Sequence, residues 1–137
     1  MLMSTIKRAG FAAIGSVCLI GSATAADMTG AQIKELISGK SVYLENTATS
    51  TGGAGQGVIY YAADGNSLFK TAKGPVQHGT WTIKGDTVCN DWKEQPNNPC
   101  SRYDKTGDTI TVINIATGQP RGKIVKTAPG NPEKIGP

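Results

Sequence analysis

The segment from Gly79 to Trp92, together with Cys100, constrains the fold of this chain more than any other feature. Its centre, Gly85-Asp86, is typical of a two-residue β-turn between two strands. Antiparallel pairing around this turn aligns three pairs of residues: Ile83 with Val88, Thr82 with Cys89, and Gly79 with Trp92. Alternation along the strands then puts four large side chains on one face of the hairpin: Trp81, Ile83, Val88 and Trp92. Cys89 points to the other face.

A second hairpin is expected directly afterwards, with Thr106-Gly107 as its turn. Three side chains then share its inner face, namely Tyr103, Ile110 and Val112, and Cys100 falls on the outer face. Both cysteines therefore leave the same side of the sheet, which predicts a Cys89–Cys100 disulfide. Closing so short a loop stabilises by about 3 kcal/mol. The alternative is a redox pair, but the spacing differs from that of a C-x-x-C motif.

The first 25 residues have the pattern of a secretory signal peptide. Lys7 and Arg8 precede an apolar run from Ala9 to Gly21, and Ala23-Thr24-Ala25 offers the small residues of a cleavage site. A membrane anchor needs about 20 apolar residues, and this run is shorter. We therefore expect a periplasmic or secreted protein without membrane insertion after cleavage. Lipid modification at Cys18 is the alternative, although the residues before it lack the usual leucine.

Residues 26–127 are predicted to form one mainly β domain. Thr29 and Gln32 make a capping-box pattern for a short N-terminal helix over residues 30–38. Eight short strands follow, at residues 41–45, 58–62, 68–71, 80–84, 87–92, 101–105, 109–115 and 122–126. Their short connections predict a small antiparallel up-and-down meander. Such a meander leaves exposed edges unless it closes, which favours a barrel over the alternative, a two-sheet sandwich. Residues 128–137, rich in proline and glycine, are expected to be a disordered tail.

Charge and composition disfavour several functions. The formal charge is +4, and removal of Lys7 and Arg8 lowers it to +2, which is too weak to suggest a nucleic-acid partner. His78 is the single histidine, so we expect no metal site and no cofactor. The glycines of residues 53–57 lead into a strand and lack the helix that a phosphate loop requires. Without a combination of nucleophile, base and oxyanion donors, we predict that the protein is not an enzyme.

The candidate ligand-binding residues are aromatic and amide side chains: Tyr60, Trp81, Asn90, Trp92, Tyr103 and Asn114. Alternation assigns all of them except Tyr60 to the inner face, and Tyr60 and Tyr61, as neighbours on one strand, point to opposite faces. Such aromatic residues most often fill a core, but a hollow barrel would let them line an apolar pocket. A buried amide needs a hydrogen-bond partner, which a ligand or a water can supply. We thus hypothesise an exported binding module for a small apolar or amphipathic ligand. The alternative is a protein-interaction or inhibitor module that binds an envelope protein through the disulfide-closed loop 89–100. The sequence leaves the oligomeric state open.

Two resemblances agree with this interpretation. Gly79-Thr80-Trp81 on a strand resembles the glycine-x-tryptophan motif of calycins, the lipocalin and avidin barrels, although in those families the motif opens the first strand. The whole chain, with its signal peptide, short helix, G-T-W strand, cysteine pair and Arg121-Gly122 ending, is similar to small uncharacterised exported proteins of proteobacteria. The second resemblance implies a cell-envelope location and transfers no functional residues.

Overall fold

The structure is a computed structural model that describes residues 15, 25–50 and 53–136. Apart from Gly15 and Ala25, the predicted signal peptide lies outside the described residues. Within them, no helix combines the length and the apolar character that crossing a membrane would require.

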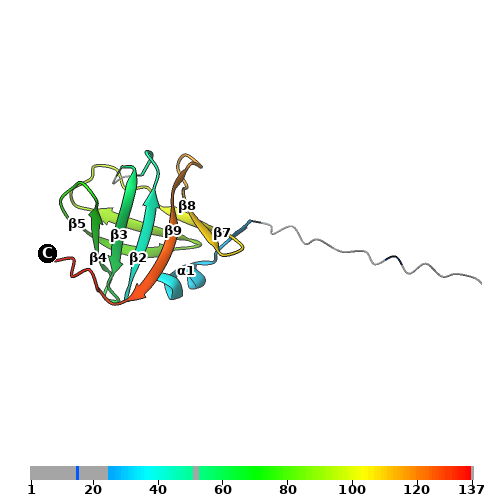
Figure 1. Ribbon diagram of the computed structural model, residues 1–137, viewed down its shortest axis with the longest axis horizontal. Helices are drawn as coiled ribbons and strands as arrows, with labels where there is room; N and C mark the ends of the chain where they lie inside the picture. The colour runs from blue at the N-terminus through cyan, green and yellow to red at the C-terminus, as the bar shows by residue number, and fades with distance from the viewer. Residues whose placement is uncertain (1–14, 16–24, 51–52, 137) are drawn as a thin grey trace, which may run out of the picture.

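The described chain forms a closed antiparallel β-barrel (Figure 1). Its elements are β1 (Ala26–Asp27), α1 (Gly30–Ile37), β2 (Lys40–Asn46), β3 (Gly55–Tyr61), β4 (Asn66–Thr71), β5 (Gln77–Lys84), β6 (Thr87–Trp92), β7 (Ser101–Thr106), β8 (Thr109–Asn114) and β9 (Pro120–Pro129). Consecutive strands from β2 to β9 pair with each other, and β9 pairs back with β2, which closes the ring. Strand β1 adds to β7 from outside the ring. The predicted barrel-like meander is confirmed, and closure removes the exposed edges that a sandwich would keep.

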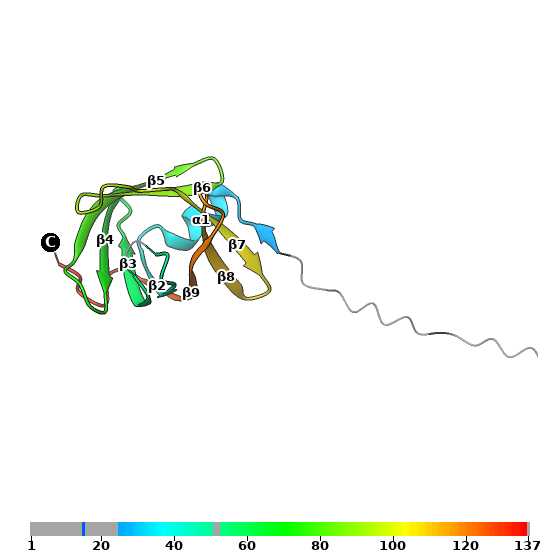
Figure 2. The same ribbon diagram turned by 90° about the horizontal axis from the view of Figure 1, so that it is seen from above.

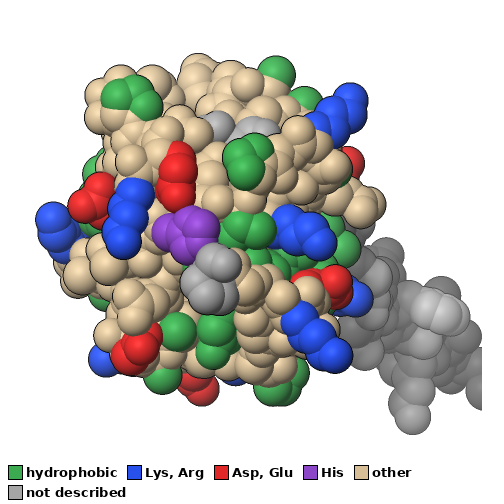
Figure 3. Space-filling model, turned by 90° about the vertical axis from the view of Figure 1, so that its left-hand side faces the viewer, with side chains coloured by type: hydrophobic (Ala, Val, Ile, Leu, Met, Phe, Trp, Pro, Cys, Tyr) green, Lys and Arg blue, Asp and Glu red, His purple; other side chains and the backbone are tan. Residues whose placement is uncertain are grey.

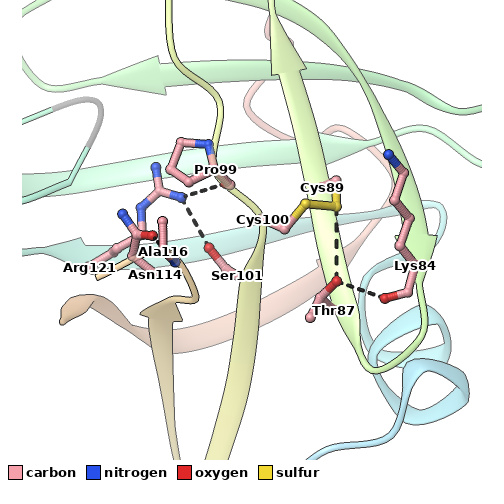
Figure 4. Close-up of a disulfide and its surroundings, with 9 residues drawn as sticks. All are labelled: Lys84, Thr87, Cys89, Pro99, Cys100, Ser101, Asn114, Ala116 and Arg121. Atoms are coloured by element: carbon pink, nitrogen blue, oxygen red, sulfur yellow. Dashed lines mark hydrogen bonds between the residues drawn. A yellow bond between two sulfur atoms is a disulfide. The ribbon is translucent and has the colours of Figure 1, made fainter. Parts of the chain in front are cut away.

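The hairpin of β5 and β6 has the predicted register. Ile83 lies opposite Val88, Thr82 opposite Cys89, and Gly79 opposite Trp92. The inward face is as expected, because Trp81, Val88 and Trp92 are buried in the core. The Cys89–Cys100 disulfide is present as well (Figure 4).

The turn of the second hairpin is displaced by one residue. Thr106 pairs with Thr109, so the turn residues are Gly107 and Asp108 rather than Thr106 and Gly107, and Gly107 has the positive φ of 59° that glycine tolerates. Tyr103 pairs with Val112 as a result. The same side chains still share the inner face, because moving the turn by one residue shifts the strand pairing by two residues and keeps the alternation.

Helix α1 covers one end of the barrel. Its start is fixed by the predicted capping box: Gln32 N donates to Thr29 Oγ1 at 3.2 Å, and Thr29 N donates to Gln32 Oε1 at 2.9 Å. Ile33 and Ile37 are fully buried, so the narrow apolar stripe of the helix faces the barrel. Gly30 N also donates to Asp86 Oδ1 at 2.8 Å, which joins the helix to the β5–β6 turn. Seen from above, α1 lies within the outline of the ring of strands (Figure 2).

The end of the chain differs from the disordered tail that we expected. Strand β9 continues to Pro129, which pairs with Lys40. Beyond it, Gly130 N donates to Gly39 O at 2.9 Å, and Asn131 exchanges two hydrogen bonds with the backbone of Ile135. Ile135 is only 4% exposed. A single apolar residue among prolines and glycines gives no periodic pattern, so composition alone could not reveal this packing.

Candidate functional site

The barrel has an interior pocket near the end opposite α1. Alternate turns of an up-and-down meander lie at opposite ends of the barrel. The β5–β6 turn and α1 therefore share one end, and the connections at the other end include residues 47–50, 53–54, 72–76, 93–99 and 115–119. The interior pocket has a volume of about 40 Å³. Its lining combines apolar residues (Leu44, Ile59, Phe69, Val88, Trp92 and Val112) with polar ones (Asn46, Ser50, Tyr61, Asn90, Asn98, Ser101, Tyr103 and Arg121), together with Pro99 and Gly122.

Arg121 supplies the charge of the interior pocket. It stands at the second position of β9, and its Nη1 donates to Ser101 Oγ at 3.0 Å and to Pro99 O at 3.3 Å (Figure 4). Both of these acceptors are uncharged. Burial lowers the pKa of Arg121, and the neighbouring Tyr61 and Tyr103 act in the opposite direction. Because a guanidinium keeps its proton in proteins, the pocket wall holds a positive charge.

Two buried tyrosines lie beside this guanidinium. Tyr61 and Tyr103 are 1% and 2% exposed. Burial raises the pKa of Tyr61, whereas hydrogen bonds to Asn90 and Tyr103 lower it. Burial, followed by the charge of Tyr61 and a hydrogen bond to it, raises the pKa of Tyr103 well above its usual value of 10.0. Both hydroxyl groups therefore stay neutral at physiological pH and act as hydrogen-bonding groups within the wall.

Two amide side chains present unpaired atoms at the interior pocket. Asn46 Nδ2 and Asn90 Oδ1 are buried and have no hydrogen-bond partner among the described residues. Asn90 Nδ2 does have one, the hydroxyl of Tyr61, at 3.3 Å. A buried polar atom without a partner is costly, and such atoms are uncommon away from bound water or ligand. The pocket wall can therefore accept further hydrogen-bond partners.

Two inward-facing glycines make room for Asn46. A Cβ atom at Gly57 would lie 2.8 Å from Asn46 Nδ2, and one at Gly122 would lie 2.7 Å from Glu45 O and 3.2 Å from Asn46 Oδ1. The distances to Asn46 Nδ2 and Glu45 O are shorter than real Cβ contacts allow, and the distance to Asn46 Oδ1 is tighter than most. The glycines of β3 and β9 thus let an amide occupy the barrel interior.

The structure brings only part of the predicted site together. Asn90, Trp92 and Tyr103 line the interior pocket. Trp81 instead packs near the α1 end of the barrel, with Nε1 donating to Ala62 O at 2.8 Å and its ring edge-on to Tyr61. Asn114 Oδ1 accepts from Ala116 N at 2.9 Å, so its side chain is used in the β8–β9 turn.

Tyr60 does not line the interior pocket, and its neighbour Tyr61 does. Adjacent residues on a strand face opposite sides, and the paired tyrosines gave no reason to prefer one over the other. Arg121 and Asn46 were missed as well. Asn46 has the same parity along β2 as the buried Val42 and Leu44, but the predicted strand ended at residue 45, so Asn46 fell outside it. Strand β9 pairs irregularly with both neighbours. Alternation counted from sequence therefore could not place Arg121.

A larger hollow, about 490 Å³, lies on the outer face of the barrel. Tyr43 at its wall is held by Glu133, which accepts from the hydroxyl at 2.8 Å, and by Lys126, whose Nζ is 4.5 Å from the ring centre. The predicted site residues do not line it. We therefore place the candidate site in the interior pocket.

Several charged surface groups form ion pairs. His78 Nδ1 lies 2.9 Å from Glu94 Oε1, with both side chains about one third exposed, at 34% and 38%. The histidine, purple in Figure 3, is thus at the surface, as alternation from Trp81 indicates. Arg102 contacts Asp27 and Asp104 on the outer face of β7. Within the described part of the chain, no group of three or more histidine, cysteine or acidic side chains is arranged to hold a metal ion.

Comparison of the chain with models of protein families, with curated proteins and with solved structures found no match.

Proposed function

We propose that this chain is an exported, non-enzymatic binding module, which takes up a small amphipathic ligand through the barrel end opposite α1. The observation that supports this most directly is the interior pocket, where a half-buried guanidinium and two incompletely paired amides meet an apolar wall. Ligand sites commonly have this composition, with a few fixed polar groups in an apolar surround.

The architecture supports the proposal in a second way. Helix α1 and its buried isoleucines fill one end of the barrel, so access to the interior pocket is from the other end. The small volume suits the polar head of a ligand, with its apolar part nearer the mouth. The disulfide is consistent with an oxidising compartment such as the periplasm, because such bonds rarely persist in the cytosol.

Titration of the purified protein with 1-anilinonaphthalene-8-sulfonate, an amphipathic fluorescent anion, tests this function. We expect saturable enhancement of the probe's fluorescence. Medium-chain amphiphiles such as octanoate should compete with the probe and reduce this enhancement. Trp92 lines the interior pocket and Trp81 does not, so energy transfer to the bound probe should decrease more in Trp92→Phe than in Trp81→Phe. The absence of saturable binding to the folded protein would overturn the proposal.

A second candidate function rests on the 93–99 loop, which joins β6 to β7 next to the disulfide. Asn98 holds this loop from within: its Oδ1 accepts from Trp92 N at 3.2 Å, and its Nδ2 donates to Gln95 O at 3.1 Å. Glu94 ties the loop to β5 by accepting from His78 N at 2.9 Å. A loop that is rigid before binding loses less entropy when a partner binds. This favours a protein-interaction module that uses the exposed residues 93, 94, 96 and 97.

Replacing residues 93–97 by glycine and serine, with Asn98 and both cysteines kept, tests this second function. The wild type and the loop variant are cross-linked in envelope extract, and the captured proteins are compared. A partner that only the wild type captures, and that binds the purified wild-type protein directly, would support the interaction module. Identical captures would rule out the loop as its contact surface.

A further inference from the structure

We infer that the interior pocket is specific for a neutral primary amide head group, which the side-chain amides of Asn46 and Asn90 hold. This inference rests on the proposed function and names the class of ligand. It follows from the two unpaired amide atoms, from the size of the pocket and from its apolar wall.

The two asparagines line the interior pocket from different strands, Asn46 at the end of β2 and Asn90 in β6. Each has one buried atom without a hydrogen-bond partner among the described residues, a donor at Asn46 Nδ2 and an acceptor at Asn90 Oδ1. The other amide atom of Asn90 is used, since Nδ2 donates to the Tyr61 hydroxyl at 3.3 Å. A ligand that pairs with both unpaired atoms must therefore offer an acceptor and a donor from one small group.

A primary amide meets this requirement however the two side chains are turned. Exchange of oxygen and nitrogen in an asparagine would replace a donor at the pocket by an acceptor, or the reverse. A primary amide carries two N–H donors and an oxygen that accepts two hydrogen bonds, so it pairs with a donor and an acceptor, with two donors or with two acceptors. A carboxylate carries only acceptors and an ammonium group only donors. Either ion would therefore leave one buried amide atom unpaired in the arrangement described above.

The size of the pocket suits the same group. Each buried water needs about 10–15 Å³ of cavity, so the volume of about 40 Å³ has room for about three water-sized groups. The three heavy atoms of a primary amide fill this space, whereas a hydroxyl group fills about a third of it. A neutral head group also costs less to bury than an ion. It needs no charge from Arg121, which already donates to Ser101 and to Pro99 (Figure 4).

The apolar part of the wall would contact the carbon chain of the ligand. Leu44, Ile59, Phe69 and Trp92 line the same pocket, and the rings of Phe69 and Trp92 pack with centres 5.6 Å apart. The inferred ligand class is therefore a small primary amide with a short aliphatic or aromatic tail.

Calorimetric titration at pH 7 with hexanamide, hexanoate and hexylammonium tests the inference, because these compounds share a chain and differ in the head group. We expect wild type to bind hexanamide at least about fivefold more tightly than either ion, since an unpaired buried polar atom costs about five- to a hundredfold in affinity.

Two variants separate the contributions of the asparagines. Asn46→Ala should lose the preference over hexylammonium, because the donor that this ion cannot satisfy is gone. Asn90→Ala should lose the preference over hexanoate, because it removes the acceptor that a carboxylate cannot satisfy. Gln56→Ala removes an exposed amide of β3 at the outer hollow, and this matched control should keep both preferences.

The outcomes separate the two levels of the proposal. If either ion binds wild type as tightly as hexanamide does, or if both preferences stay unchanged in the two asparagine variants, the amide inference is overturned and the binding module still stands. Failure of wild type to bind any of the three compounds or the fluorescent probe would overturn both. If neither variant folds, NMR of the wild type decides: the side-chain NH₂ signals of Asn46 and Asn90 should move with hexanamide while that of Gln56 stays in place. Signals of Asn46 and Asn90 that do not move would overturn the amide inference.

Discussion

Cys89 and Cys100 occupy the antiparallel position next to the Val88–Ser101 pair, with their Cα atoms 4.2 Å apart. That pair is the only bridge between β6 and β7 in the described chain, whereas β5 and β6 share six pairs. Farther along, β7 pairs with β1 instead, at Asp27 and Asp104. The disulfide therefore joins the two strands where the barrel wall has the least backbone pairing.

Loss of the disulfide should destabilise the barrel by about 3 kcal/mol, the chain-entropy value for a loop of this length. The double variant Cys89→Ala, Cys100→Ala compared with wild type in urea unfolding measures this difference. Dithiothreitol should destabilise the wild type similarly and leave the double variant unchanged, which separates the bond from other effects of the reductant. A difference below about 1 kcal/mol would mean that β6 and β7 hold together without the bridge.

Gly79 is required because the Trp92 indole lies directly against it. A Cβ atom at this position would meet the Asp91 carbonyl oxygen and lie 2.7 Å from Trp92 Cε3. We expect Gly79→Ala to lower the free energy of unfolding by about 1–3 kcal/mol, as overpacking of a core does. Gly136→Ala, where nothing lies within 4 Å, is the matched control and should change stability by less than about 0.5 kcal/mol. Equal stability of the two variants would show that the indole can move aside.

The sequence predicts the register of the β5–β6 hairpin to the residue, because Gly85 and Asp86 fix the turn, although β5 begins three residues earlier than predicted. The disulfide follows from the same alternation. The closing contact, β9 with β2, joins residues more than 75 positions apart and has no local sequence pattern. Its existence was expected only because open edges are unfavourable.

The candidate site was harder to predict, since bulges and irregular pairing interrupt alternation there. Val112 faces inward as expected, and Asn114 lies opposite the buried Ser101, but the Asn114 side chain accepts a hydrogen bond from Ala116 N and is used in the turn. The β8–β9 register shifts between Val112 and Ile113, where Arg121 is the extra residue of β9. The β2–β9 pairing shifts as well, between Tyr43 and Leu44. Arg121 lies on the strand that both irregularities affect. Asn90, on the regular strand β6, was placed correctly by the same reasoning.

The stability of the loop next to the pocket should depend on the ionisation of Glu94. Hydrogen bonds from the side chain and then the backbone of His78 lower the pKa of Glu94 below its usual value of 4.5. The carboxylate is therefore favoured in the folded state, and its contribution is present above about pH 4.5 and is lost as the pH falls through the lower, folded pKa. An NMR titration should find that His78→Ala raises the pKa of Glu94 toward 4.5.

Asp64 provides an internal reference for that titration. Hydrogen bonds from the backbone and side chain of Asn66 lower the pKa of Asp64, and His78 is not involved. The pKa of Asp64 should thus be the same in wild type and in His78→Ala. A parallel change at both carboxyl groups would indicate a general change in the fold rather than loss of the His78 contact.

At alkaline pH, the two pocket tyrosines should make the barrel less stable. Burial is the main cause that raises the pKa of Tyr61 and of Tyr103 above 10.0, so the folded state keeps both hydroxyl groups neutral. Below about pH 10 neither state ionises them and the stability is fully present. As the pH rises above that value, the unfolded chain loses these protons and the folded chain does not, so stability falls until the folded pKa is passed.

Tyr103→Phe removes one of these two groups and keeps the ring in the core. Between pH 9 and pH 11, the free energy of unfolding should fall in both proteins, and the fall should be about 1.4 kcal/mol smaller in the variant. This difference is the contribution of one proton over the one pH unit above the unfolded pKa. Urea unfolding followed by circular dichroism at several pH values measures the difference. Since lysines and the exposed tyrosines are the same in both proteins, their titration cancels in the comparison. Parallel falls in wild type and variant would mean that the Tyr103 hydroxyl ionises without unfolding, and hence that the interior pocket is open to water.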